Sequence, residues 1–385
     1  MNSILINKSF DEKYAAQPEL IIQSPGRINI MGEHTDYNDG FVLPAAINYY
    51  IFSSFNKNQN RKIRLYSKDF DEEYQVELDD LNECELGWAN LILGVVDQIK
   101  DRIEGFDLVF SGNIPKGAGL SSPATICSSI VYGLAELCDL NLSKWDMVKI
   151  AQNSEHNFAH VNCGIMDQFA CLFGITNHAL QLNCLTLDYI EYEFDLEEYK
   201  LILINSNVPH TLHDSDYNAR RKESQRAIEL IGRWDSSVEN YQNLSPEALS
   251  AFENRLNNKE YRRAKHIVTE NQRVHDISEA LANRQFEKAG KLLNESHLSE
   301  KDDYEITCKQ TDYLVEELNK YGTIMGARQV GGGFGGCVLA LARDYKLDEL
   351  IEEVGEAYKK KFSLSLTNIP VKISMGCHKL EGEHV

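Results

Sequence analysis

The sequence has no apolar run that approaches the roughly 18 residues needed to cross a lipid bilayer. Its first residues, MNSILINKSFDEKY, lack the apolar core of a signal peptide. Basic residues are also scarce, because 39 Lys and Arg stand against 59 Asp and Glu, a formal net charge of -20. Nucleic-acid grooves and anionic membrane surfaces select basic patches. We therefore expect neither nucleic acid nor a membrane as a partner.

The nine cysteines are odd in number and include no C-x-x-C pair. Disulfide frameworks and zinc sites usually show paired, closely spaced cysteines. Scattered cysteines are typical of buried thiols in a reducing compartment, so the sequence predicts a cytoplasmic protein. It carries no signal of oligomeric state, and a monomer is the expectation.

The common nucleotide-binding motifs are missing as well. No G-x-x-x-x-G-K-[ST] occurs, which argues against a P-loop NTPase. The glycine-rich run at residues 331–336 fits G-x-G-x-x-G literally, but a dinucleotide fingerprint must open a helix. Here the following CVLALA reads as a strand. A glycine hairpin without a ligand is the simple alternative.

Hydrophobic patterning predicts a mixture of strands and helices. Short apolar segments bounded by turn residues predict strands at residues 19–23, 62–66, 106–110, 200–205 and 337–341. Helical spacing predicts helices over residues 124–138 and from Ser143, which forms a capping-box pattern with Asp146, to about Phe158. Residues 218–293 are also helical in pattern. This is an α+β pattern.

A chain of 385 residues is longer than one hydrophobic core usually grows, so two domains are expected. The strand-like restart at residue 200 suggests a boundary near residue 195 and therefore domains 1–195 and 196–385. A cleft between the two is the default position for a site.

Two stretches combine glycine with polar residues. PKGAGLSS, at residues 115–122, stands between a predicted strand and a predicted helix, an order that directs backbone N–H groups and a helix dipole at an anion. An ordinary strand–turn–helix junction is the alternative. GRINIMGEHTDYNDG, at residues 26–40, interleaves glycines with hydrogen-bonding side chains. It reads as a solvated turn or as a loop that approaches a polyol closely.

Two carboxylates also stand out. Asp167 lies in the otherwise apolar run NCGIMDQFACLFG, where burying an unpaired carboxylate would be costly. We therefore expect Asp167 to be paired or to take part in chemistry. Glu155 lies on a predicted helix, where a solvated position is usual for a glutamate.

Together these stretches resemble the GHMP small-molecule kinases and, within them, the galactokinase branch. Residues 26–40 are similar to the signature of that branch, PKGAGLSS to the family's ATP-phosphate loop, and GARQVGGGFGGCVLAL to its third motif. The similarity continues in order through WAN, EHNFA, CGIMDQ, NVPHTLHDSDYNARR and ESHLSEKDDYE. It implies a ribosomal-S5-like N-terminal domain, a ferredoxin-like C-terminal domain and an active site between them.

The resemblance implies transfer of the γ-phosphoryl group of ATP, with Mg²⁺, to the anomeric hydroxyl of galactose. Matched by position, Asp167 is the implied base and Arg27 the residue that stabilises charge, a combination that suits phosphoryl transfer. The implied sugar contacts are Glu33, His34, Asp36, Gly164 and Tyr217. The implied phosphate loop comprises Gly117, Ala118, Gly119, Leu120, Ser121 and Ser122. The implied metal ligands are Glu155 and Ser122.

The sequence departs from the family pattern on the nucleotide side. The family's phosphate loop continues GLSSSA, whereas Pro123 here removes a hydroxyl and an N–H at once. Proline is nevertheless favoured at the first helical position after a serine cap. Leu93 and Pro209 replace basic residues, and Val330 stands where threonine is common. Two alternatives therefore stay open: a kinase for a related hexose, and a galactose-binding regulatory protein with weakened use of ATP.

Overall fold

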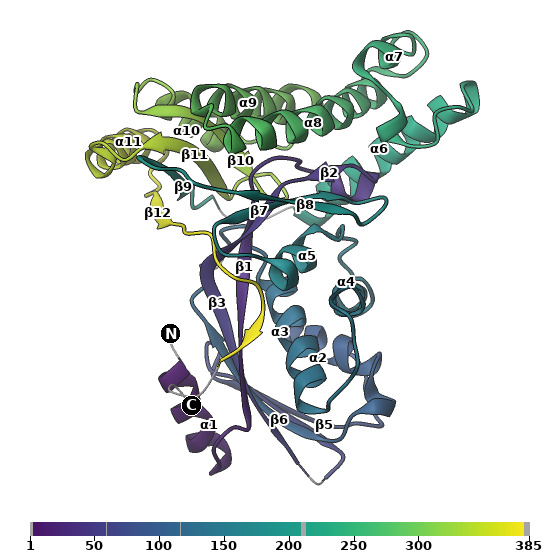
Figure 1. Cartoon of the computed structure of the whole chain (residues 1–385), viewed down its shortest axis with the longest axis vertical. Coiled ribbons are helices and arrows are strands. Elements are labelled where there is room, and N and C mark those ends of the chain that lie inside the picture. The colour runs from purple at the N-terminus through teal and green to yellow at the C-terminus, as the bar shows by residue number, and fades with distance from the viewer. Residues whose placement is uncertain (1–2, 59, 116, 209–212, 381–385) are drawn as a thin grey trace.

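The structure is a computed structural model that describes residues 3–58, 60–115, 117–208 and 213–380. In outline the molecule is a T, with a stem built around one sheet and a crossbar of long helices (Figure 1). Helices and strands occur in both parts, which confirms the predicted α+β class.

The stem contains a six-stranded sheet in the order β13-β1-β3-β6-β4-β5. Its strands are β1 (Leu20–Asn29), β3 (Pro44–Lys57), β4 (Lys62–Ser67), β5 (Glu72–Glu77), β6 (Phe106–Gly112) and β13 (His378–Lys379). Three predicted strands belong to this sheet. However, β1 continues through a register shift after Pro25 as far as Asn29, so Arg27 lies on a strand and not in a loop.

Side chains of the stem sheet alternate between its two faces, so each face presents apolar residues that must be covered. Ile21 packs with Ile6 and Phe10 of helix α1 (Ser3–Tyr14). The neighbouring Ile22 points to the opposite core, where helices cover the other face (Figure 1). These helices are α2 (Gly87–Asp97), α3 (Ser122–Leu137), α4 (Lys144–Phe158) and α5 (Met166–Phe173).

Helices α3 and α4 confirm the two predicted helices. Ser143 caps α4 as expected, since its Oγ accepts from the N–H of Asp146 at 3.1 Å and the Asp146 carboxylate accepts in return. The start of α3 differs from the expected serine cap followed by Pro123. Ser121 precedes the helix with a left-handed φ of 63° and forms no side-chain cap, and Pro123 is the second residue of the helix.

The crossbar contains a four-stranded antiparallel sheet in the order β10-β11-β9-β12. Its strands are β9 (Tyr199–Asn205), β10 (Ile324–Val330), β11 (Cys337–Arg343) and β12 (Thr367–Pro370). The helices of this half are α6 (His213–Trp234), α7 (Pro246–Ser250), α8 (Asn258–Ala282), α9 (Phe286–Ser299), α10 (Lys309–Leu318) and α11 (Leu347–Phe362). This chain order and strand order form the ferredoxin-like arrangement that the resemblance implied.

A small sheet lies where stem and crossbar meet (Figure 1). It pairs β2 (Phe41–Val42), β7 (His178–Asn183) and β8 (Tyr189–Glu193). One core cluster spans this junction, because Ile28 and Ile30 of the first half pack in it with Leu203 and Val274 of the second. The predicted boundary at residue 195 falls between β8 and β9, and it stays a prediction.

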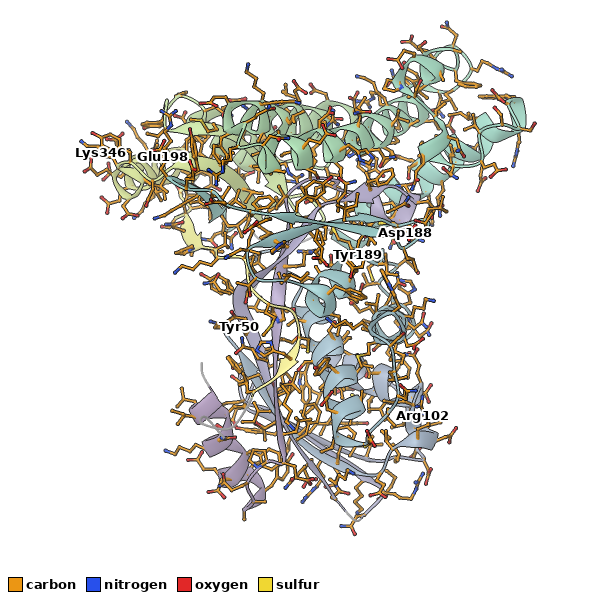
Figure 2. All side chains as sticks on the ribbon, viewed as in Figure 1. Tyr50, Arg102, Asp188, Tyr189, Glu198 and Lys346 are labelled. Carbon is orange, nitrogen blue, oxygen red and sulfur yellow. The ribbon has the colours of Figure 1, made fainter. Side chains whose placement is uncertain are left out.

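The C-terminal segment runs back along the stem. Its Ser374 Oγ lies 2.7 Å from the hydroxyl of Tyr50, which Figure 2 labels on the stem, and its strand β13 then pairs with β1. Within the described residues, no helix combines the length and the apolar character needed to span a membrane.

Candidate active site

A cavity of about 600 Å³ is lined by segments from both halves of the chain. Its walls come from β1, the segment that follows β1, the loop before α3, helices α4, α5 and α6, and the glycine-rich loop between β10 and β11. The predicted site residues that line it are Arg27, Glu33, His34, Asp36, Gly117, Ala118, Gly119, Leu120, Ser121, Ser122, Glu155, Gly164, Asp167 and Tyr217. The structure therefore brings together every residue that the sequence analysis named for the site.

Arg27 and Asp167 form a bidentate pair in the cavity wall. Nε of Arg27 donates to Oδ1 of Asp167 and Nη2 to Oδ2, both at 2.7 Å. The third guanidinium nitrogen, Nη1, donates to the carbonyl of Gly119 at 2.7 Å. Burial acts to lower the pKa of Arg27, but the Asp167 carboxylate outweighs it and raises that pKa. The expectation that Asp167 is paired is confirmed.

The loop before α3 is shaped by left-handed backbone conformations. Gly117 and Gly119 each have a φ of 70°, and Ser121 has a φ of 63°. At Gly119 a Cβ would meet nothing closer than 3.8 Å, so the backbone conformation and not the available space favours glycine. Such a loop leading into a helix N-terminus directs N–H groups toward an anion.

Glu33 and His34 are buried in the segment after β1. Oε1 of Glu33 accepts hydrogen bonds from Nη2 of Arg328 at 2.9 Å and from the N–H of Gly331 at 3.0 Å. One of its two oxygens is therefore already engaged by the protein. Nδ1 of His34 lies 2.5 Å from the hydroxyl of Tyr37. Burial lowers the pKa of His34 to about 3, so its imidazole is neutral.

Asp36, Gly164 and Tyr217 complete the predicted sugar side. Burial and the nearby Asp167 raise the pKa of Asp36 to about 7. A Cβ on Gly164 would fall 1.9 Å from Oδ2 of Asp36, so only glycine allows this approach. The ring of Tyr217 lies 5.1 Å from the ring of His34. Aromatic and carboxylate groups thus share one wall of the cavity.

Glu155 is buried on α4, which overturns the solvated position expected for it. Its Oε1 accepts from Nε2 of Gln168 at 2.6 Å. Burial and then the charge of Asp167 raise the pKa of Glu155 to about 8. Within the described residues no cluster of three or more Asp, Glu, His or Cys side chains could hold a metal by itself. The hydroxyl of Ser122 and the Glu155 carboxylate are nevertheless hard oxygen donors that suit Mg²⁺ when phosphate and water oxygens complete its coordination.

The residues at which the sequence departs from the family pattern lie in different surroundings. Pro123 and Val330 both line the cavity, one at the start of α3 and the other at the end of β10. Leu93 is fully buried in α2 and is not part of the cavity lining. Pro209 lies outside the described residues.

Sequence reasoning missed the polar side chains that support the wall from behind. These are Arg328, Glu270 and His266, which contact residues 29–33. Only Arg328 carried a signal, because an arginine inside an apolar strand must be paired if it is buried.

Three family models match the chain. The GHMP kinases N terminal domain matches residues 90–175, the galactokinase galactose-binding signature residues 8–57, and the GHMP kinases C terminal model residues 277–360. Together these matches span more than half of the chain. The signature includes β1 and the segment that carries Glu33, His34 and Asp36.

Known proteins are similar over nearly the whole chain. Galactokinases of Thermotoga petrophila and Haemophilus influenzae are each 39% identical, over 93% and 95% of this chain and 99% and 96% of their own. The crystal structure of Lactococcus lactis galactokinase complexed with galactose has a TM-score of 0.94 at 33% identity, covering 98% of this chain and 99% of that one. A mevalonate kinase with a TM-score of 0.64 at 18% identity, over 92% of this chain and 100% of its own, shares the fold. With its cavity, its fold and these relatives in agreement, the chain is a sugar kinase that belongs to the galactokinase family of the GHMP kinases.

Proposed function

We propose that this kinase transfers the γ-phosphoryl group of ATP to the anomeric hydroxyl of D-galactose and releases galactose 1-phosphate. The observation that carries the proposal is the bidentate Arg27–Asp167 pair, set between a loop shaped for phosphate and a wall of buried polar side chains. The similarity to galactokinases over nearly the whole chain supports the choice of sugar.

Asp167 is the proposed base. Three donors hold its carboxylate: Nε and Nη2 of Arg27 and the hydroxyl of Ser121. A carboxylate has about four acceptor positions, so one is left for the sugar hydroxyl whose proton moves as its oxygen attacks phosphorus. Arg27 stays charged and offsets the negative charge that develops.

The sugar contacts in this proposal are Glu33, His34, Asp36, Gly164 and Tyr217. Glu33 would accept from a sugar hydroxyl through its second oxygen, because Oε1 is already engaged. A buried site that pairs each hydroxyl rejects an isomer that leaves one of its partners unpaired. Selectivity for galactose would arise in this way.

The ATP phosphates would lie on the loop of Gly117, Ala118, Gly119, Leu120, Ser121 and Ser122. Glu155 and Ser122 would hold Mg²⁺. When bound, the ion would supply positive charge that offsets the charge of the phosphates. Its binding requires Glu155 to lose the proton that burial and Asp167 favour.

We further propose that the enzyme acts as a cytoplasmic monomer with domains 1–195 and 196–385. The scattered cysteines, without a C-x-x-C pair, support the cytoplasm, and the net charge of -20 supports the absence of a nucleic-acid or membrane partner. The four-stranded sheet that begins at β9 supports the division into these domains. Galactose and Mg-ATP are the proposed partners, without nucleic acid or membrane.

One experiment separates the proposal from both alternatives. A coupled ADP-release assay is run with Mg-ATP over a panel of monosaccharides, beside calorimetric titration with galactose. Turnover with galactose alone supports the proposal. Faster turnover with another hexose selects a related kinase, and galactose binding without ADP release selects a regulatory protein.

A further inference from the structure

Behind the cavity wall, three buried side chains of the second half hold the segment that carries Glu33. Arg328 lies on β10, and His266 and Glu270 lie on α8. Each of the three is 0% exposed, and none belongs to the cavity lining. They therefore cannot contact a substrate and can act only through the residues that they hold.

Arg328 uses its whole guanidinium group. Nη2 donates to the carbonyl of Asn29 at 2.7 Å and to Oε1 of Glu33 at 2.9 Å, and Nε donates to the carbonyl of Ile30 at 3.0 Å. Nη1 donates to Oε1 of Glu300 at 2.6 Å. Four acceptors in fixed directions require the planar fork of arginine, which the single nitrogen of lysine does not reproduce.

Glu270 holds the backbone of the same segment. Its Oε1 accepts from the N–H groups of Gly32 at 3.1 Å and Glu33 at 3.4 Å. Burial acts to raise its pKa, but Arg273, His266 and Arg328 outweigh burial and lower that pKa to about 2. The carboxylate is therefore charged, and hydrogen bonds to a charged acceptor are the stronger kind.

His266 holds the carbonyl of Glu33. Its Nε2 lies 3.1 Å from that oxygen and its Nδ1 lies 2.9 Å from Oγ of Ser299. A carbonyl oxygen can only accept, so Nε2 carries the proton and Nδ1 accepts from the serine. Burial lowers the pKa of His266 to about 4, which keeps this neutral form at physiological pH.

The N–H, the carbonyl and one carboxylate oxygen of Glu33 are thus all held from the second half. Gly331 adds a further bond to the same Oε1, at 3.0 Å, from the loop that follows β10. Among the described residues, the hydrogen bonds and the ion pair of the Glu33 carboxylate all use Oε1, and Glu33 lines the cavity. The arrangement leaves one oxygen of defined orientation for a ligand.

We propose that Arg328, Glu270 and His266 are positioning residues that fix Glu33 so that Oε2 meets one hydroxyl of the sugar. The inference rests on the function proposed above and assigns sugar affinity and selectivity to residues outside the cavity. Loosening Glu33 weakens sugar binding and the rejection of isomers. Residues 118–122 of the proposed phosphate loop share no hydrogen bond with the three side chains, so the affinity for ATP is kept.

Steady-state kinetics of Arg328→Lys and His266→Leu test the proposal, with the Michaelis constants for galactose and ATP measured separately. The galactose KM is expected to rise about ten- to a hundredfold in Arg328→Lys, the scale of one charge-assisted hydrogen bond. It rises less in His266→Leu, which loses a neutral bond, and His266→Gln restores it because the amide can donate to the Glu33 carbonyl. The ATP KM stays near the wild-type value, and discrimination between galactose and glucose falls.

Arg263→Lys is the matched control. Arg263 is equally buried and donates to Glu223, Glu305 and the Asp303 carbonyl, none of which lines the cavity. Equal rises in the galactose KM of Arg263→Lys and Arg328→Lys would overturn the proposal, and so would a lower kcat at unchanged galactose KM.

Other outcomes also decide the question. If Arg328→Lys does not fold, the contrast between His266→Leu and His266→Gln carries the test alone. Wild-type protein that does not phosphorylate galactose contradicts the proposed function instead. Calorimetric galactose affinity of the same variants then decides the positioning role, and unchanged affinity overturns it.

Discussion

Asp167 has three hydrogen-bond donors on its carboxylate and faces the cavity, so its replacement separates chemistry from folding. Asp167→Asn keeps the size of the side chain and one acceptor for Arg27 but removes the proposed base. Turnover should fall by about 10²- to 10⁴-fold, the usual contribution of a positioned base. The affinity for galactose, measured by calorimetry, should stay close to that of the wild type. Retained turnover would remove Asp167 from this role.

Asp107→Asn is the matched control for that variant. Asp107 is buried and pairs with Arg64 through the same two guanidinium atoms, Nε and Nη2, but it lies on β6 of the stem. It is not part of the cavity lining. Loss of stability without loss of turnover is expected there, so an equal fall in turnover would show that Asp167 acts through folding.

Glu155 gives a prediction about pH. Its folded-state pKa of about 8 lies above its ordinary 4.5, so its stabilising contribution is present below pH 4.5 and is lost as pH rises through 8. Glu155→Gln removes this loss while its amide oxygen still accepts from Gln168. Without Mg²⁺ and nucleotide, the variant should gain unfolding free energy over wild type between pH 5 and pH 8, by more than about 1.4 kcal/mol. A gain that does not change with pH in denaturant titrations would contradict this.

At the scale of single residues, the sequence predicted which residues line the cavity better than it predicted their burial and hydrogen-bond partners. The need to pair Asp167 followed from one carboxylate in an apolar run, and Arg27 meets it. Glu155 could not be placed, because helical spacing alone does not say which helix face another part of the chain will cover. The burial of Glu270 and His266 could not be predicted either, because both lie in a charged helix whose pattern also fits a solvated surface.

At the scale of elements, a substitution at the start of α3 tests how proline affects the proposed phosphate loop. Pro123→Ser restores a hydroxyl and an N–H at the second residue of the helix. The Mg-ATP concentration for half-maximal rate should fall about tenfold, with a cost of roughly 0.4 to 1 kcal/mol in stability. An unchanged Mg-ATP requirement would show that Ser122 or water already supplies the missing contact.

Pro246→Ser provides the control for the helix start. Pro246 is the first residue of α7 and follows the capping Ser245, outside the cavity lining. A similar loss of stability without any change in the Mg-ATP requirement is expected. A matching shift in both variants would assign the effect of Pro123→Ser to general loosening.

Strand β3 was not predicted and strand β1 was predicted too short, and the sequence gives the reason in each case. Strand β3 buries most positions on both faces, so it lacks the alternation that marks a half-exposed strand. Strand β1 passes through Pro25 and Gly26, residues that read as a turn, because a register shift accommodates them beside β3. Helix α4 was predicted almost to the residue because its capping box is a local signal.

At the scale of the whole molecule, the shared core predicts that stem and crossbar unfold together. Leu203 of β9 packs in the same cluster as Ile28 and Ile30 of the first half. Leu203→Ala should cost about 2 to 5 kcal/mol and lower one common transition. Calorimetry should show a single peak in both proteins.

Intrinsic tryptophans give an independent check of this cooperativity. Trp88 and Trp145 lie on stem helices and Trp234 on α6 of the crossbar. Fluorescence of variants that retain only one of these tryptophans should report the same midpoint. Two resolved transitions, with the crossbar melting first, would contradict a shared core.

The relation between the two halves could not be read from local patterns. Arg328 lies 295 residues from Glu33 in sequence, and no spacing rule joins residues so far apart. The family resemblance supplied the order of the motifs and the expectation of a site between two domains. Only the structure showed that charged side chains of the second half hold the segment of the first half that carries Glu33.

In the proposed function, the cavity directs phosphoryl transfer to the anomeric oxygen of galactose. The most direct measurement is the ³¹P spectrum, with coupling to sugar protons, of the product formed from galactose and Mg-ATP by the wild-type enzyme. We expect one sugar phosphate whose phosphorus couples to the anomeric proton, formed in step with ADP. Phosphate on any other hydroxyl, or ADP release without a sugar phosphate, would contradict it.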